Sequence, residues 1–209
     1  NAFDEVCKYY SADGLAAPFE RQALIKLRHI AGDAALGRKV EAHRDSFVYS
    51  GAPWDLTTAI DLRRQQVKQL VEPGQVNLKH SHGGIVTLEY AIQYLQVMHG
   101  HRHASLRTPN TLRALAALID ADLIPRTTGE NLRKSYLFIR MLIDGLRMVR
   151  GNTKDLVLPP PDSDEFIFLA RRVGYQTEDW QAGAKHLLSD IEQHMKQNRE
   201  FFEKMFGKV

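Results

Sequence analysis

Apolar residues recur at helical spacing along most of this chain. Between residues 84 and 100 they fall at positions i, i+3, i+7 and i+10 with no intervening proline, as Leu88, Ala91, Leu95 and Met98. An α-helix turns once in about 3.6 residues, so these positions share one side of it. The pattern predicts a helix from Gly84 to Gly100 with one buried face.

A second run repeats this pattern between residues 131 and 150. Its steps are four, three, four and three residues, at Leu132, Tyr136, Ile139, Ile143 and Leu146. Such spacing is typical of a helix packed in a bundle. Gly151 and Asn152 follow it directly and are suited to the end of a helix.

Capping residues predict two further long helices. One covers 55–72, where Asp55 is the expected N-cap and Pro73-Gly74 the stop. The other covers 177–205, where Thr177 is the expected N-cap. Together with the two periodic runs, they make four long helices.

Shorter helical segments are predicted over 3–10, 19–30, 33–49, 108–120 and 163–173. The segment at 108–120 begins with Thr108 as the expected N-cap and Pro109 at an early helical position, where a missing N–H matters least. Helices are therefore expected along nearly the whole chain.

Extended structure has little support in the sequence. The sheet-like candidates, 76–78 and 156–158, are too short to found a sheet. The stiff triplet Pro159-Pro160-Pro161 is expected to separate the main bundle from the last helices. We therefore predict an all-α fold, with a helical bundle over 33–158 and a C-terminal helical extension over 162–209.

Composition narrows the class of protein. With 44% hydrophobic and 25% charged residues among 209, the chain is globular in type. Its net charge of +3 comes from interspersed acids and bases, without the basic stripe typical of nucleic-acid binders. The single Cys7 excludes a disulfide framework and a four-thiolate zinc site.

Targeting signals are absent from the pattern. No stretch approaches the roughly 18 consecutive apolar residues of a membrane span. The first ten residues have neither a basic region nor an apolar region of a signal peptide. We expect a cytoplasmic protein with no membrane or nucleic-acid partner, and the opening suggests a part of a longer polypeptide.

Five histidines lie close together in sequence and suggest a metal site: His80, His82, His99, His101 and His103. Imidazole binds zinc, copper or nickel. The two H-x-H groups lie in polar segments rich in Gly, Ser and Arg, without the cysteines or helical turns that fix a structural zinc site. Solvated side chains are the preferred interpretation, and no metal ligand is predicted.

Two pairs of acids have the D-x-D spacing of metal-dependent phosphoryl transfer: Asp120 with Asp122, and Asp162 with Asp164. The first pair ends a predicted helix, and the second follows three prolines and precedes another. Helix capping is the preferred interpretation. The G-x-S-x-G, P-loop and G-x-G-x-x-G patterns do not occur, so no catalytic residue is predicted.

Two basic segments remain as candidate binding sites. Residues 19–28 place Arg21 and Lys26 on a short helix, about 140° apart in projection, so they do not share one face. In the alternative interpretation the bases of this segment pair with Glu20 and Asp33 and only support packing.

The second segment, residues 77–85, leads a glycine pair into a helix. Free N–H groups and the helix dipole favour an anion at such a start. Lys79, His82 and the N–H groups of Gly83 and Gly84 can converge there, with Glu89 holding Lys79 or completing a polar site. Alternatively, the glycines serve only the turn and Glu89 pairs with an arginine to fix helix packing. The predicted nucleotide- or effector-binding residues are Arg21, Lys26, Lys79, His82, Gly83, Gly84 and Glu89.

Four stretches of the chain resemble known sequence patterns. Asn1-Ala2-Phe3 with Tyr9-Tyr10 resembles the pattern A-F-x-x-Y-Y, and residues 20–33 resemble W-E-R-Q-A-L-I-K-A-R-x-x-A-G-D. Residues 79–89 resemble K-x-G-x-G-G-I-x-D-I-E-F, and 106–112 resemble L-R-T-x-x-T-L. In this order, the four patterns resemble the bacterial glutamine synthetase adenylyltransferase family and, more distantly, the PII-protein uridylyltransferases. The order and spacing agree over roughly residues 1–150. The departures are Phe19 for Trp, His82 for Pro or Gly, and Thr87 for Asp.

This resemblance implies that residues 1–32 are the tail of a nucleotidyltransferase domain and that a helical region follows. The catalytic carboxylates of the family lie in an upstream G-S-x-x-D-x-D strand that this chain lacks. We therefore expect this segment alone to be inactive and to hold no cofactor, while the parent enzyme uses ATP and magnesium.

Two functions remain open at this point. The resemblance implies a segment that binds substrate or regulator in an enzyme that adenylylates glutamine synthetase or removes the group by phosphorolysis, with glutamine synthetase and the PII protein as partners. The alternative is a non-catalytic helical module that binds a protein or an effector in a divergent paralogue.

Overall fold

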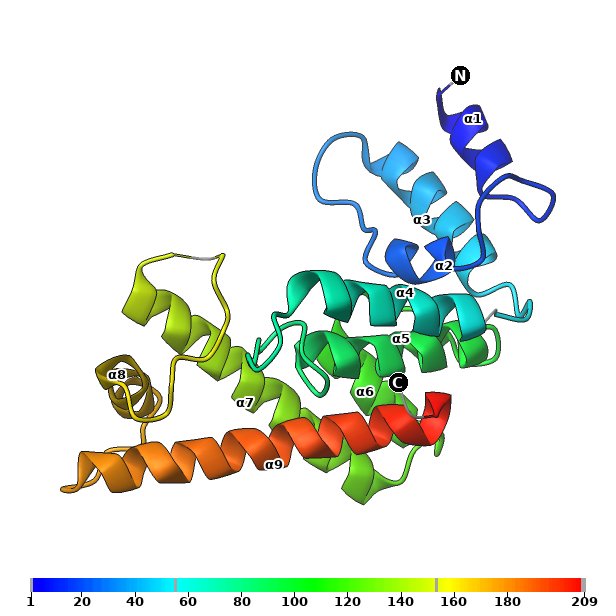
Figure 1. Ribbon diagram of the computed structural model, residues 1–209. Helices are drawn as coiled ribbons and strands as arrows, with labels where there is room; N and C mark the ends of the chain where they lie inside the picture. Colours follow the sequence, from blue (N-terminus) through cyan, green and yellow to red (C-terminus); the bar gives the residue numbers. More distant parts are fainter. Residues whose placement is uncertain (1, 55, 153, 208–209) are drawn as a thin grey trace. The chain divides into compact units, whose positions relative to one another are not determined.

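The structure is a computed structural model that describes residues 2–54, 56–152 and 154–207 (Figure 1). Within these ranges the protein is all-α, which confirms the predicted fold class. The helices are α1 (Ala2–Tyr9), α2 (Glu20–Leu24), α3 (Ala34–Val48), α4 (Leu56–Leu70), α5 (Ile85–His99), the 3₁₀ turn η1 (Ala104–Leu106), α6 (Thr111–Asp120), α7 (Arg126–Arg150), α8 (Asp164–Arg172) and α9 (Trp180–Phe206).

The chain divides into two compact units, each made of two separate stretches of sequence. The first unit comprises Asn1–Ala59 and Tyr90–Gly129, and the second comprises Ile60–Glu89 and Glu130–Val209. The boundaries fall inside α4, α5 and α7. The domain boundaries predicted at residues 32–33 and 158–162 stay predictions.

One hydrophobic cluster in the core of the first unit gathers side chains from four regions of the sequence. Its buried members are Ile25, Val48, Tyr49, Trp54, Ala59 and Val97. Trp54 stacks on Tyr94 with ring centroids 5.5 Å apart, and Arg107 lies over the ring of Tyr49 at 5.7 Å. Burial of large apolar and aromatic surface is the main stabilising contribution in such a core.

The second unit is built on the apolar faces of α7 and α9 and on α8. The predicted face of α7 is buried at Leu132, Ile139, Ile143 and Leu146, and Tyr136 is half-buried. In α9 the buried positions recur at intervals of three, four and seven residues, at Ala184, Leu187, Ile191, Met195 and Phe202. The 3.6-residue period therefore identifies the packed side of both helices.

Several helix ends lie within a residue of their predicted positions. Asp33 accepts hydrogen bonds from the N–H groups of Ala35 and Leu36 and begins α3. Ser163 accepts one from Phe166 N–H and begins α8, so α8 follows the predicted range to within a residue at each end. Gly151, with φ at +64°, follows α7 as expected. The proposed cap Asp55 lies outside the described residues.

Other helix starts differ from prediction. Asn110, rather than Thr108, caps α6 by accepting a hydrogen bond from Arg113 N–H. Asp179, rather than Thr177, caps α9 by accepting hydrogen bonds from the N–H groups of Gln181 and Ala182. In both cases a second capping residue lies two positions downstream, and Asn and Asp cap at least as well as Thr. Helix α7 begins at residue 126, five positions before the predicted start.

The predicted helix over 19–30 is wrong beyond its first turns, because α2 ends at Leu24. Beyond that point the backbone finds partners on α3. Arg44 donates to the carbonyl of Leu27, and the carboxylate of Glu41 accepts from His29 N–H. Hydrogen bonds to side chains of α3 thus replace the intrahelical ones. Sequence periodicity cannot predict such contacts with another helix.

The two sheet-like candidates meet each other. Residues 76–78 and 156–158 form an isolated antiparallel bridge between Asn77 and Val157. Leu78 N–H donates to Leu156 O at 2.9 Å, and Leu158 N–H donates to Val76 O at 2.7 Å. The bridge anchors the segment that leads into α5.

Candidate functional site

The candidate residue Arg21 is built into the first unit. Its side chain is 3% exposed. Nε and Nη2 donate to Val48 O at 3.0 and 2.8 Å, and Nη1 donates to Ala52 O at 2.8 Å. Carbonyl groups at the end of a helix lack intrahelical donors. Arg21 therefore satisfies the C-terminal end of α3.

Lys26 and Glu20 also make internal contacts in this unit. Lys26 Nζ donates to Pro109 O and to Thr111 Oγ1, both at 3.0 Å, at the start of α6. Glu20 Oε1 accepts from Tyr9 OH at 3.0 Å and from Ala17 N–H at 2.9 Å. The ligand role predicted for Arg21 and Lys26 stays a prediction, and the contacts observed are those of packing.

The second candidate segment is a tight loop held by its own side chains. Asn77 Oδ1 accepts from the N–H groups of Lys79 and His80, both at 3.0 Å. Ser81 Oγ accepts from Asn77 N–H at 2.8 Å. Asn and Ser favour such local bonds to nearby backbone. They give the loop one defined shape before the start of α5.

The N–H groups of the glycine pair point into this loop. Gly83 N–H donates to Thr87 Oγ1 at 3.1 Å, and Gly84 N–H donates to Ser81 O at 2.8 Å. The Thr87 hydroxyl therefore serves the loop at the position where the family pattern has Asp. Both N–H groups have acceptors within the protein, and their predicted role in binding an anion stays a prediction.

Arg63 on α4 supports the loop from inside, where it is 1% exposed. Its Nη2 donates to His80 O at 2.8 Å and to Thr87 Oγ1 at 3.0 Å. A buried guanidinium is retained where oxygen acceptors surround it. Arg63 thereby joins α4 to the loop and to the first turn of α5.

Asn198 on α9 holds the other side of the loop and is fully buried. Its Nδ2 donates to Gly83 O at 2.9 Å, and its Oδ1 accepts from Ser135 Oγ of α7 at 2.8 Å. Gly83 has φ at +87°, and a Cβ added there would lie 2.1 Å from Met195 O. Only glycine fits this approach of loop to α9.

The remaining candidates face away from this packing. Lys79 and His82 are exposed, and Glu89 is half-buried with Oε1 accepting from Tyr136 OH at 3.4 Å. Of the residues predicted in this loop, His82 lines a cavity and the glycines shape the wall behind it. The ligand roles of Lys79 and Glu89 stay predictions.

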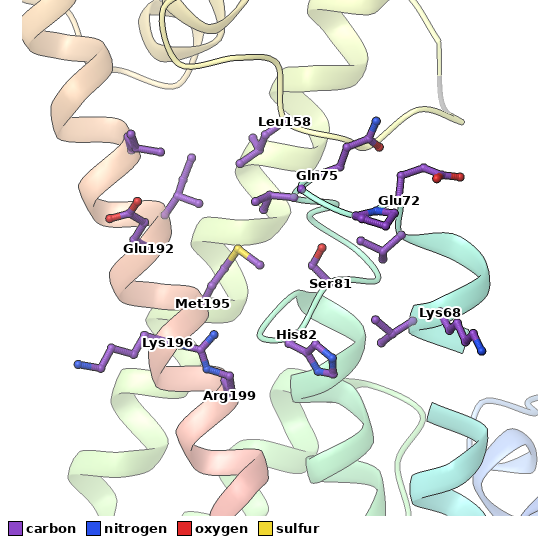
Figure 2. A pocket seen from close by; sticks show the side chains of 17 residues that line it. Lys68, Glu72, Gln75, Ser81, His82, Leu158, Glu192, Met195, Lys196 and Arg199 are labelled. Atoms are coloured by element: carbon purple, nitrogen blue, oxygen red, sulfur yellow. The ribbon is translucent and has the colours of Figure 1, made fainter. Parts of the chain in front are cut away.

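The cavity has a volume of about 600 Å³ and lies between the end of α4, residues 71–82, Leu158 and α9 (Figure 2). Ser81 is its buried polar wall. Its apolar lining comprises Val67, Val71, Pro73, Val76, Leu158, Leu188, Ile191 and Met195. Charged side chains surround this lining at Lys68, Glu72, Glu192, Lys196 and Arg199, together with the imidazole of His82. A mostly apolar cavity of this size with a few polar groups is typical of a ligand site.

The electrostatics at the His82 end are set by its neighbours. Although the His82 side chain is exposed at the surface, partial desolvation of its ring lowers its pKa, the positive charges of Arg63 and Arg199 lower it further, and Glu203 acts in the opposite direction. Burial, with Lys79 and Arg63, lowers the pKa of His80 to about 4. Both imidazoles are therefore neutral near pH 7.

Several of these residues carried no recognised signal in the sequence. Arg63 looked like one of many charges on a polar helix, and the partners of Asn198 lie more than sixty residues away in the chain. The basic pair Lys196 and Arg199 could have been noticed, because both flank the apolar face of α9.

Metal binding and membrane insertion were searched over the described residues. In them, no three His, Cys, Asp or Glu side chains lie together as a metal site would need. Nor does any described helix have the length and apolar character to cross a membrane.

Comparison with known proteins gives a consistent picture. Residues 58–206 match the family model of the GlnD PII-uridylyltransferase. Three curated relatives share the name bifunctional glutamine synthetase adenylyltransferase/adenylyl-removing enzyme. That of Mycobacterium bovis is 35% identical over 75% of this chain and 16% of its own length. The enzyme of Nitrosococcus oceani is 32% identical over 99% of this chain and 20% of its own length. The enzyme of Corynebacterium glutamicum is 30% identical over 88% of this chain and 18% of its own length.

The chain thus spans about a fifth or less of the length of these relatives. The family match contains the described part of the second unit from residue 60 to Phe206, including the loop and the cavity. On this match and these identities, the chain belongs to the family of glutamine synthetase adenylyltransferases and PII-uridylyltransferases.

Proposed function

We propose that this chain is a helical segment of a nucleotidyltransferase that acts on glutamine synthetase, and that it binds substrate or regulator rather than performing the transfer. The observation that carries the proposal is the cavity beside His82, whose wall is the loop that the family resemblance singles out. Its function is recognition by a fixed surface.

The loop is well suited to recognition because its inner face is already satisfied. Arg63, Thr87 and Asn198 supply hydrogen-bond partners to its backbone. The side chain of His82 is therefore presented in a defined place without ordering on binding. Preorganisation of this kind reduces the entropy lost when a partner binds.

The names of the relatives supply the larger context of the proposal. Glutamine synthetase is the proposed acceptor, and a PII protein is the proposed regulator, in a cytoplasmic enzyme. ATP and magnesium, which the family resemblance implies for the parent enzyme, are proposed to act outside this segment. The D-x-D acids do not fit a metal site, because Asp164 lies in the first turn of α8 behind Ser163 and Asp120 ends α6. No step of the transfer is assigned to this segment.

The test uses the full-length enzyme and a variant that fills the cavity from its rim. Val76 lines the cavity and is 40% exposed, so Val76→Trp adds bulk with little loss of core packing. Leu70→Trp is the matched control, because Leu70 is 49% exposed and ends the same helix, α4, that leads to the cavity.

Rates of adenylylation and of adenylyl removal on glutamine synthetase are measured with and without the PII protein. We expect Val76→Trp to lower at least one of these rates, or its response to the PII protein, by about tenfold, which corresponds to about 1.4 kcal/mol. Leu70→Trp should leave them unchanged. Equal rates and responses in both variants and the parent enzyme would overturn the proposal.

A further inference from the structure

The cavity beside His82 has two chemically different ends. Figure 2 shows Leu158 and Gln75 at one end, and His82, Lys196 and Arg199 at the other. Met195 lies between them on α9. A ligand that satisfies the whole cavity must therefore combine an apolar body with a charged group.

The charge of the second end is positive but modest. The positive charges of Arg63 and Arg199 lower the pKa of His82, and the negative charge of Glu203 raises it. Lys196 lies 3.8 Å from Glu200 on the exposed side of α9, which offsets part of its charge. A singly charged anion matches this balance better than a triphosphate does.

We propose that the cavity binds a small amphiphilic anion, with its acid group at Arg199 and His82 and its apolar body against Val71, Leu158 and Ile191. The inference deepens the proposed function, because it rests on the same cavity as the recognition site and names the class of its ligand. The volume of about 600 Å³ is in the range of small-molecule sites.

The acid group gains directional hydrogen bonds at this end. The Arg199 guanidinium can donate two parallel N–H bonds to one carboxylate or sulfonate. Neutral His82 retains one ring N–H that can donate a further bond. An anion beside the imidazole favours its charged form, so the pKa of His82 should rise when the ligand binds.

The apolar body gains burial on a wall that is already fixed. Met195 O packs against Gly83, and Asn198 bonds the same loop to α9. The wall between Met195 and Ser81 is thus formed without the ligand. The free energy of burying apolar surface there is not offset by ordering of the protein.

The test uses the 209-residue chain and two aryl probes of similar shape. 8-Anilino-1-naphthalenesulfonate carries one negative charge, and N-phenyl-1-naphthylamine carries none. Titration by fluorescence gives the dissociation constant and stoichiometry of each. The variants are Arg199→Gln at the charged end, Val76→Trp at the rim, and Arg64→Gln on α4 as the control. Arg64 is an exposed partner of Asp61. Circular dichroism and thermal melting confirm that each variant is folded.

We expect the anionic probe to bind once per chain, and Arg199→Gln to weaken it about tenfold because a charge-assisted bond is lost. The same variant should leave the uncharged probe unaffected. Val76→Trp should weaken both probes, and Arg64→Gln neither. In the parent chain, saturation with the anionic probe should raise the pKa of His82 in a proton NMR titration.

If neither Arg199→Gln nor Val76→Trp changes the dissociation constant of the anionic probe, the inference is overturned. The cavity is then left as a surface for a protein partner. The probe titration needs neither ATP nor glutamine synthetase. Its failure is therefore distinguishable from failure of the proposed function, which is judged by the transferase rates of the full-length enzyme.

Discussion

Residues 19–28 in the first unit and the loop at 77–84 in the second are both basic segments predicted to bind a ligand. Their basic side chains have different roles in the structure. In the first, Arg21 and Lys26 themselves satisfy backbone carbonyls of α3 and of the start of α6. In the second, Arg63 from α4 performs that task for the loop. The loop is left with His82 facing a cavity. A basic side chain is available to a ligand where other groups satisfy the backbone around it.

The packing of the loop against α9 depends most strongly on Gly83. Gly83→Ala places a Cβ 2.1 Å from Met195 O at a φ of +87°, so α9 and the loop must separate. We expect a loss of about 4 kcal/mol or more in the free energy of unfolding. Chemical denaturation measures it.

Gly74→Ala is the control for this prediction. Gly74 has a similar φ of +80°, but no atom lies within 4 Å of its added Cβ. The loss there should be about 1 kcal/mol, the penalty for the backbone conformation alone. Equal losses at Gly74 and Gly83 would show that the approach to Met195 is not what fixes the loop.

The structural role of Arg21 can be broken separately. Arg21→Met removes three donors and leaves the carbonyl of Val48 buried without them. We expect a loss of about 3 kcal/mol in stability. Arg28→Met, at an exposed position of the same segment, should change stability by less than about 0.5 kcal/mol.

The same variants test the contrast between the units. Under conditions in which Arg21→Met is folded, it should bind the anionic naphthalene probe as the parent chain does. Weaker binding that is specific to Arg21→Met would place Arg21 in a ligand site and remove the distinction between the two segments.

Thr87 tests whether side-chain hydrogen bonds stabilise the loop at 77–84. Its hydroxyl accepts from Gly83 N–H and Arg63 and lies 3.3 Å from Ser81 O as a donor. Thr87→Val keeps the shape and removes these bonds, so we expect a loss of about 2 kcal/mol. Thr87→Ser keeps the hydroxyl and should lose less than about 1 kcal/mol. Urea titration of both variants checks the difference, and a Thr87→Val loss no larger than that of Thr87→Ser would contradict the role given to the hydroxyl.

How far the sequence predicts this molecule depends on where the deciding contacts lie. Helix α8 follows its predicted range within a residue, because the cap Ser163 is next to the helix that it begins. The helix predicted to continue after Leu24 does not, because the backbone of that segment has its partners Arg44 and Glu41 on another helix. Local chemistry fixes helix starts, and distant side chains decide whether a helix continues.

The candidate site shows the same division. His82 and the glycine pair are recognisable from their position before a helix. Asn198 and Met195 are not, because they reach Gly83 from more than a hundred residues along the chain. Sequence reasoning therefore found the loop and missed the α9 side of the cavity.

The last prediction concerns the acid dependence of the second unit. The folded state holds His80 neutral, with a pKa of about 4 against 6.5 in the unfolded chain. Below pH 6.5 the unfolded chain binds a proton that the folded chain resists, so stability falls as the pH goes from about 6.5 towards 4. His80→Gln should flatten this decline in thermal melting between pH 7.5 and 4.5. An unchanged slope would contradict the environment described for His80.

The division of each unit into two stretches of sequence also has a consequence for how the protein is made. The loop at 77–84 leaves the ribosome long before α9, which supplies Met195 and Asn198. Since domains fold as their parts are synthesised, the wall of the loop cannot form until α9 has been synthesised. A nascent chain stalled before α9 should therefore expose this region to a protease, and a nascent chain extended beyond α9 should protect it.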